Sequence, residues 1–138
     1  GTKCGALFGE AVVFPKRNTV PHFFSIVKQH GALLAKSRIA GVQFDTLFTN
    51  QLYEKGGETA LLAADRIRSA LREKDYPLAY EAPTNQIFLV LDEAQKTRLS
   101  KQIEMGFWEN LADGKTIMRI ATSWATQDED VDRLIALL

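Results

Sequence analysis

The stretch that decides the fold is Gly1-Thr2-Lys3-Cys4-Gly5, which runs directly into Ala6-Leu7-Phe8-Gly9-Glu10-Ala11-Val12-Val13-Phe14. The second part is rich in Val, Phe and Leu, a composition typical of a strand that is buried on both faces. Lys3 would then lie at the mouth of a buried strand, where a lysine is rarely found without a function. A desolvated lysine amine has a lowered pKa and can form a Schiff base with a carbonyl cofactor. The alternative is an exposed lysine in a glycine turn.

The composition is that of an ordinary globular chain. Its 138 residues include 17 Lys and Arg, 17 Asp and Glu, and 46% hydrophobic residues, so it can bury a sizeable core. A formal charge of zero gives no reason to expect nucleic acid or an anionic membrane as a partner. No apolar run approaches the roughly 20 residues of a membrane span, and no signal-peptide pattern is present.

Cysteine and histidine are too few for a disulfide framework or a structural zinc site. The single cysteine excludes an intrachain disulfide, which favours a reducing, cytoplasmic compartment. His22 and His30 could share a helix face, but no Asp, Glu or Cys stands at ligand spacing beside them. We interpret them as helix-surface or partly buried histidines and predict no metal site.

The first half of the chain is predicted to be mainly helical after the opening strand. Apolar spacing predicts a helix from Thr19 to about Lys36 and a second one from Lys36 to Tyr53. Gly56-Gly57 is expected to break the chain. The clearest helix is predicted from Glu58 to Lys74, where alanine and leucine dominate and charged residues fill the opposite face.

The second half alternates between short strands and helices. Strands are predicted at 78–80, 86–91, 106–108 and 116–121, the last two joined by a hairpin turn at Asp113-Gly114. Asp92 and Gln95 form the pattern of a capping box for a helix reaching about Glu104. A second such box, Thr126-Gln127-Asp128-Glu129, is predicted to open the last helix. This order predicts a small α/β domain with a mostly antiparallel sheet covered by helices on one side.

Several segments resemble a known enzyme family. The opening segment, Thr84-Asn85-Gln86-Ile87-Phe88, and the stretch from Met118 to Asp132 are similar, in this order, to the low-specificity threonine aldolases. These enzymes belong to the β-eliminating-lyase group of fold-type I pyridoxal-phosphate (PLP) enzymes. The resemblance implies that the chain is the C-terminal fragment of such an enzyme. Residues 1–57 would be the remnant of the large PLP-binding domain, and residues 58–138 the linker helix and small C-terminal α/β domain.

The resemblance also implies the cofactor, the activity and the site residues. Lys3 would be the lysine that holds PLP as a Schiff base, although Cys4 stands where many relatives have asparagine. Arg38, or its neighbour Lys36, would reach the cofactor phosphate, unless it is a solvated helix arginine. Arg119 would bind the substrate's α-carboxylate; the alternative from periodicity is an internal salt bridge to Glu109, Asp113 or a helix-capping acid.

The implied reaction is cleavage of β-hydroxy-α-amino acids, such as L-threonine or allo-threonine, to glycine and an aldehyde. A small amino acid is thus the expected partner, and the intact enzyme is expected to be a homodimer or homotetramer. We expect the 138-residue chain alone to be inactive, with its apolar opening strand either disordered or paired with a second copy. Two alternatives remain: another PLP reaction, such as β-elimination or transamination, and a non-catalytic interaction module.

Overall fold

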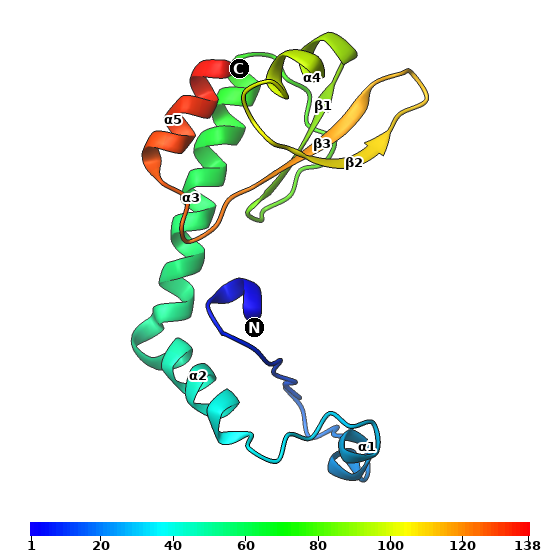
Figure 1. The fold of residues 1–138 in the computed structure, drawn as a ribbon, viewed down its shortest axis with the longest axis vertical. Helices are drawn as coiled ribbons and strands as arrows, with labels where there is room; N and C mark the ends of the chain where they lie inside the picture. Colours follow the sequence, from blue (N-terminus) through cyan, green and yellow to red (C-terminus); the bar gives the residue numbers. More distant parts are fainter. The chain divides into compact units, whose positions relative to one another are not determined.

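The computed structural model describes the whole chain, residues 1–138, as two compact units: residues 1–54 and residues 55–138. The helices and strands follow the chain as α1 (Phe23–Gln29), α2 (Arg38–Phe48), α3 (Leu52–Glu73), β1 (Gln86–Leu91), α4 (Glu93–Leu99), β2 (Gly106–Asn110), β3 (Thr116–Ala121) and α5 (Asp128–Leu137) (Figure 1). The expected domain boundary after residue 57 falls inside α3, close to where the two units divide. The origin of the first unit in a large cofactor-binding domain stays a prediction.

The first unit contains no strand, so the predicted opening strand is wrong. Thr2–Cys4 form a short 3-10 turn, and the chain after it is irregular. The side chains of Leu7 and Val13 are 85% and 79% exposed. The physical reason is that a strand exists only beside a neighbour that takes up its backbone hydrogen bonds, and the first unit supplies none.

The two helices of the first unit are shorter than predicted. α1 ends at Gln29, and Gly31 follows it with a left-handed φ of 70°. The predicted helix through Tyr53 is interrupted, because Asn50 and Gln51 adopt φ values of 54° and 58° between α2 and α3. Asparagine tolerates this left-handed conformation better than most residues, which explains a break there.

Helix α3 is the predicted alanine-rich helix with an earlier start. It passes through Gly56 and Gly57, so the predicted break at this pair is wrong. Two glycines cost about 1 kcal/mol each in a helix interior. The cost is tolerated because the remaining turns of this 22-residue helix are rich in Ala and Leu and bury a continuous stripe, which includes Ala64, Ile67 and Leu71.

The second unit is built on a three-stranded antiparallel sheet in the order β1-β3-β2. In the pairing of β1 with β3, Gln86 lies opposite Ala121 at one end and Leu91 lies opposite Thr116 at the other. β2 and β3 form the predicted hairpin, in which Gly114 takes the left-handed φ of 83° that its turn needs. The Asp113 carboxylate accepts a hydrogen bond from the Lys115 backbone amide, which lowers the pKa of Asp113. The predicted strand at 78–80 is reduced to a bridge between Leu78 and Leu89.

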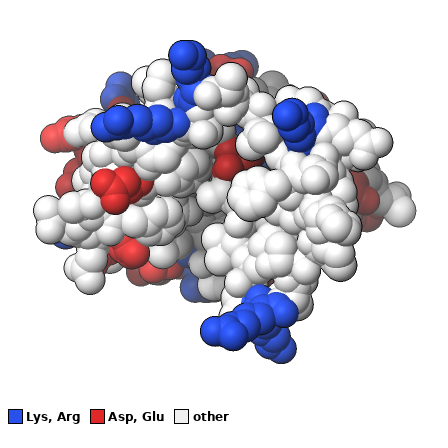
Figure 2. Space-filling view, turned by 90° about the horizontal axis from the view of Figure 1, so that it is seen from below, with Lys and Arg blue, Asp and Glu red and all other residues white.

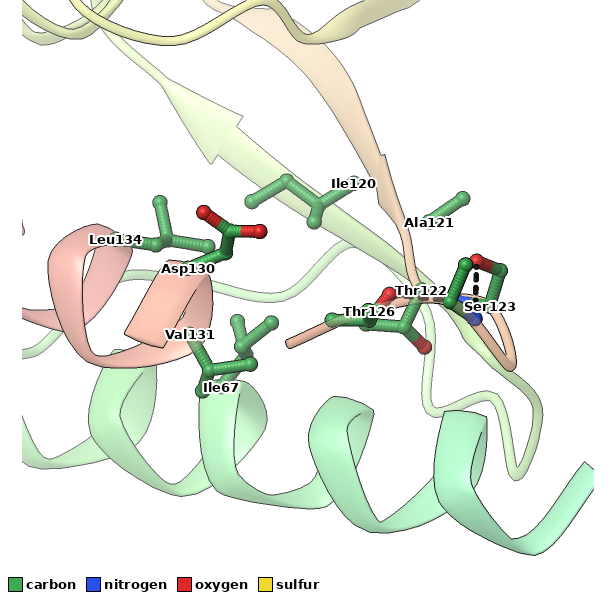
Figure 3. Close-up of a pocket in the computed structure, with 10 residues that line it drawn as sticks. Ile67, Ile120, Ala121, Thr122, Ser123, Thr126, Asp130, Val131 and Leu134 are labelled. Atoms are coloured by element: carbon green, nitrogen blue, oxygen red, sulfur yellow. Dashed lines mark hydrogen bonds between the residues drawn. The ribbon is translucent and has the colours of Figure 1, made fainter. Parts of the chain in front are cut away.

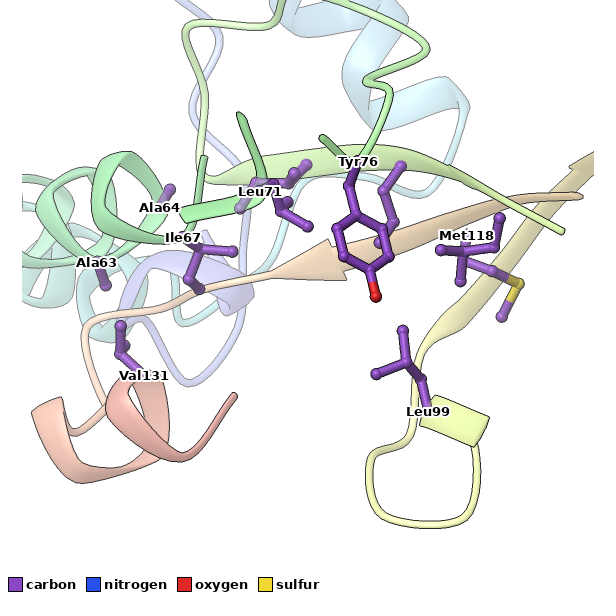
Figure 4. Close-up of a cluster of buried hydrophobic side chains, with 11 residues drawn as sticks. Ala63, Ala64, Ile67, Leu71, Tyr76, Leu99, Met118 and Val131 are labelled. Carbon is purple, nitrogen blue, oxygen red and sulfur yellow. The ribbon is translucent and has the colours of Figure 1, made fainter. Parts of the chain in front are cut away.

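One face of this sheet carries the hydrophobic core. Side chains from α3, β1, β3, α4 and α5 meet there, as Figure 4 shows for Ile67, Leu71, Leu99, Met118 and Val131. In β1, alternate residues are buried, and Leu89 and Leu91 are 0% exposed. Each fully buried aliphatic side chain contributes roughly 1.5–3 kcal/mol. The predicted α/β unit with an antiparallel sheet is therefore confirmed.

The two C-terminal helices differ in how they begin. At α4 the predicted capping box is confirmed: Asp92 accepts from the Gln95 amide at 2.7 Å, and the Gln95 side chain accepts from the Asp92 amide at 3.1 Å. At α5 the predicted box is wrong. Gln127 is the N-cap residue, and the Thr126 hydroxyl accepts instead from the Ser123 amide, which closes the preceding turn.

Helix α5 is held along α3 by charged side chains. Arg66 on α3 reaches Asp128 and Asp132 on α5, and Lys74 donates to the Ile135 carbonyl at 2.8 Å. Charged side chains are dispersed over the surface. Figure 2 shows a largely uncharged face on which blue and red side chains are interspersed. None of the helices combines the length and apolar character that a membrane span requires.

Candidate functional site

Lys3 lies in the middle of the Thr2–Cys4 turn, in the first unit. Gly5 ends this turn with a left-handed φ of 101°, a conformation that favours glycine. The Lys3 side chain is exposed and makes no hydrogen bond or ion pair. The expected position at the mouth of a buried strand is thus wrong, because no strand forms. The amine is nevertheless free of internal partners.

The segment after Lys3 is fastened to α2 by Gln43. Its side-chain oxygen accepts from the backbone amides of Leu7 at 2.6 Å and Phe8 at 3.4 Å, while its amide group donates to the Ile39 carbonyl. Sequence reasoning missed this role, because a contact across 36 residues leaves no local pattern. Gln43 therefore fixes the segment that follows the lysine turn.

Tyr53 adds a contact at Cys4. Its hydroxyl donates to the Cys4 sulfur at 3.8 Å, and this hydrogen bond is the main cause of a raised pKa of Tyr53. The turn that carries Lys3 is thereby connected to the first residues of α3. The neighbour of the lysine thus has a structural contact of its own.

Arg38 is the first residue of α2. Its side chain is exposed and has no acidic partner, and Ser37 before it makes no side-chain capping bond. A cation at this end opposes the helix dipole. Arg38 is therefore a positive charge without an acidic partner at the start of a helix, a position that suits an anion such as a phosphate.

Arg119 lies in the centre strand β3 of the second unit, on the sheet face opposite the core. Its neighbours across the sheet are Phe88 on β1 and Gly106 on β2. The side chain is half-buried; its guanidinium donates to the Gln86 side-chain oxygen at 3.4 Å and lies 5.8 Å from the centre of the Trp108 ring. Neither contact supplies a negative charge.

The alternative of an internal salt bridge at Arg119 is not realised. Asp113 pairs with Lys115 at 3.2 Å instead, and Glu109 forms no ion pair. Arg119 therefore holds a positive charge in a half-buried place without a carboxylate. Such a group can bind a planar anion through two parallel N–H bonds.

A pocket of about 330 Å³ lies on the core side of the second unit, between α3, the end of β3 and α5 (Figure 3). Its lining is mostly apolar or small, as with Ile67, Ile120 and Leu134. The only charged residue in the lining is Asp130, which pairs with Arg133. No lysine or arginine lines the pocket, so it offers no cation to a phosphate or carboxylate ligand and is not the candidate site.

Comparisons with known proteins support the resemblance seen in the sequence. No protein-family model and no curated protein sequence matches the chain. A structure of Leishmania major threonine aldolase is similar over 86% of this chain and 34% of its own, with 31% identity and a TM-score of 0.79. Sphingomonas wittichii serine palmitoyltransferase is similar over 72% of this chain and 26% of its own, with 18% identity and a TM-score of 0.57.

The chain has the fold of the C-terminal part of fold-type I PLP enzymes. The predicted resemblance to threonine aldolase is thereby confirmed, and it spans about a third of the length of that aldolase. Within this fold-type I chain, the first unit holds Lys3 and Arg38, and the second holds Arg119. The site roles of all three residues stay predictions.

Proposed function

We propose that this chain is part of a PLP-dependent lyase that cleaves β-hydroxy-α-amino acids, such as threonine, to glycine and an aldehyde. The proposal is supported by the similarity to a threonine aldolase structure at 31% identity. The observation that carries it within the chain is Arg119, a half-buried cation without an acidic partner. An amino-acid substrate brings the carboxylate that this arginine lacks.

The residues of the first unit fit the cofactor. The Lys3 amine has no internal hydrogen bond, so it is available to bond a carbonyl carbon. Arg38 is a free cation at a helix start and suits the cofactor phosphate. When bound, PLP supplies an electron sink for the bond that breaks at the substrate's α-carbon. Lys3 would attach the cofactor and Arg38 would orient it.

Arg119 would hold the substrate by its α-carboxylate. Its planar fork can donate two parallel hydrogen bonds, which fixes both the position and the rotation of the bound amino acid. Rotation matters because the orientation of the bound amino acid would decide which of its bonds breaks. Charge-assisted bonds of this kind contribute about 1.5–3 kcal/mol.

The test is Arg119→Ala in the holoenzyme that contains this chain. We expect kcat/KM for L-threonine to fall about tenfold or more, since about 1.4 kcal/mol corresponds to each decade. Cofactor loading should stay nearly unchanged, and Arg119→Lys should recover only part of the activity, because lysine has no fork. Arg133→Ala, which removes an exposed arginine paired with Asp130, is the matched control.

Two results would contradict this role. One is wild-type kcat/KM in Arg119→Ala; the other is loss of folding or of cofactor loading in that variant. Product analysis with L-threonine, allo-threonine and cysteine tests the reaction separately. Release of ammonia and an oxo acid in place of glycine and an aldehyde would identify an elimination instead.

A further inference from the structure

The open face of the sheet carries a row of aromatic rings that leads to Arg119. Tyr80 meets Phe88 edge to face at 5.4 Å, and Phe88 meets Trp108 in the same way at 4.8 Å. The Arg119 guanidinium carbon lies 5.8 Å from the centre of the Trp108 ring. Tyr80 and Phe88 therefore pack in series against one side of Trp108, and Trp108 contacts Arg119.

The backbone of β2 places Trp108 on the same face of the sheet as Arg119. The pairing of β2 with β3 shifts register between Phe107 and Glu109, so Trp108 is the additional residue of a bulge. Gly106, two residues before Trp108, lies opposite Arg119, so strand alternation places the Trp108 ring on the face of Phe88 and Arg119. Gly106 lies across from Arg119, and a Cβ atom there would make only an ordinary van der Waals contact with the Arg119 Nε atom, at 3.4 Å.

The contact with the Trp108 ring restricts the Arg119 side chain more than its hydrogen bond to Gln86 does. The 3.4 Å contact with Gln86 is long and leaves most of the guanidinium N–H donors unused. An arginine free to move loses rotamer entropy when it binds an anion. A guanidinium already placed beside an aromatic ring loses less, and the ring's quadrupole attracts its charge.

We propose that Trp108 is a positioning residue for Arg119. This inference rests on the proposed carboxylate role of Arg119. It adds that Trp108 orients the Arg119 guanidinium before the substrate binds. Trp108 touches neither the cofactor nor the reacting bond in this scheme. It acts through Arg119 on ligands that carry a carboxylate.

The first experiment detects the contact between Trp108 and Arg119 in the 138-residue chain without cofactor. In proton–nitrogen NMR spectra, the Trp108 ring current should displace the Arg119 Nε–H resonance, and Trp108→Ala should move it back toward the value of a free arginine. Trp108→Phe should keep part of the displacement. An unchanged resonance in Trp108→Ala would overturn the proposal, whatever the enzyme's reaction.

The second experiment measures ligand binding in the holoenzyme. Trp108→Ala should raise the KM for L-threonine about three- to tenfold, with a smaller change in kcat, as expected for loss of a cation–π contact. Affinity for L-threoninol, which lacks the carboxylate, should stay unchanged. Phe107→Ala is the matched control: this aromatic neighbour is 62% exposed and pairs with Met118, so it lies on the other face.

A rescue variant completes the test. Trp108→Phe should restore the KM to near the wild-type value. Equal weakening of threonine and threoninol would show a general structural defect and overturn the positioning role. If Arg119→Ala itself leaves threonine binding unchanged, the proposed function fails, and the NMR result still shows whether the stack exists.

Discussion

At the scale of single residues, Lys3 and Arg119 are constrained very differently. Lys3 is exposed in a short turn and has no partner, whereas Arg119 is half-buried and contacts Gln86 and Trp108. A side chain in the middle of a sheet inherits fixed neighbours from strand register. The contacts of a side chain in a turn depend on which other segments pack over that turn.

The attachment role of Lys3 gives a residue-scale prediction. In the holoenzyme, Lys3→Ala should abolish covalent attachment of PLP, because no other amine replaces the one in the turn. Borohydride treatment followed by peptide mass analysis should find the cofactor on Lys3 in the wild type and on no residue in the variant. Lys28→Ala, which removes another exposed lysine of the first unit, should keep the label. Cofactor fixed at a different lysine would contradict the assignment.

At the scale of elements, local sequence patterns predicted some helices and strands correctly and others wrongly. The capping box of α4 formed because Asp92 and Gln95 satisfy each other's backbone amides within one turn. The opening strand did not form, although its composition is as strand-like as that of β1. β1 has β3 beside it, and the segment from Ala6 to Phe14 has no neighbouring strand.

The capping box gives an element-scale prediction. Asp92→Ala should lower the free energy of unfolding of the second unit by about 1 kcal/mol, since the Gln95 amide loses its acceptor. Urea unfolding followed by circular dichroism measures the change. Gln127→Ala is the matched control, because Gln127 occupies the N-cap position of α5 without a side-chain capping bond. Equal losses in the two variants would show that the box contributes nothing beyond its position.

At the scale of the whole molecule, the two units differ in how well they are buried. Nearly all core residues lie in the second unit, and in the first only Ala6 and Leu47 are buried. Large apolar side chains of the first unit remain exposed, among them Leu7, Val13 and Phe24 at 85%, 79% and 74%. Surfaces of this kind usually mark contacts with another polypeptide.

This imbalance predicts that the chain associates in solution through its first unit. Sedimentation velocity should show species larger than a monomer at micromolar concentration. Val13→Lys with Phe24→Lys should shift the chain toward monomer, because each change places a charge on the apolar surface. Leu62→Lys, at a residue 60% exposed in the second unit, is the control. A wild-type chain that sediments as a monomer would contradict this prediction.

A further prediction concerns the activity of the isolated chain. Supplied with PLP and L-threonine, the 138-residue chain should release no glycine above background. Lys3 is exposed to water and has no hydrogen-bond partner, so the cofactor meets a simple surface amine. Turnover by the purified chain, without any other polypeptide, would overturn the prediction and place all catalytic groups within these residues.

The sequence by itself determined the second unit well. Strand β1 and the hairpin of β2 and β3 followed from alternating or continuous apolar residues between turn signals, and the resemblance to threonine aldolase followed from three ordered segments. These features are local, so a short stretch of chain contains the information that fixes them. The same holds for the capping box at Asp92 and for the acidic first turn of α5.

Only the tertiary structure decided what depends on distant partners. The exposure of Lys3, the fastening of its segment by Gln43 and the missing counter-ion of Arg119 all depend on residues far away in the chain. The contact of Trp108 with Arg119 is a property of strand pairing, because it depends on the register of β2 against β3. Backbone and charged groups take the partners that folding brings near them, and no local pattern encodes that choice.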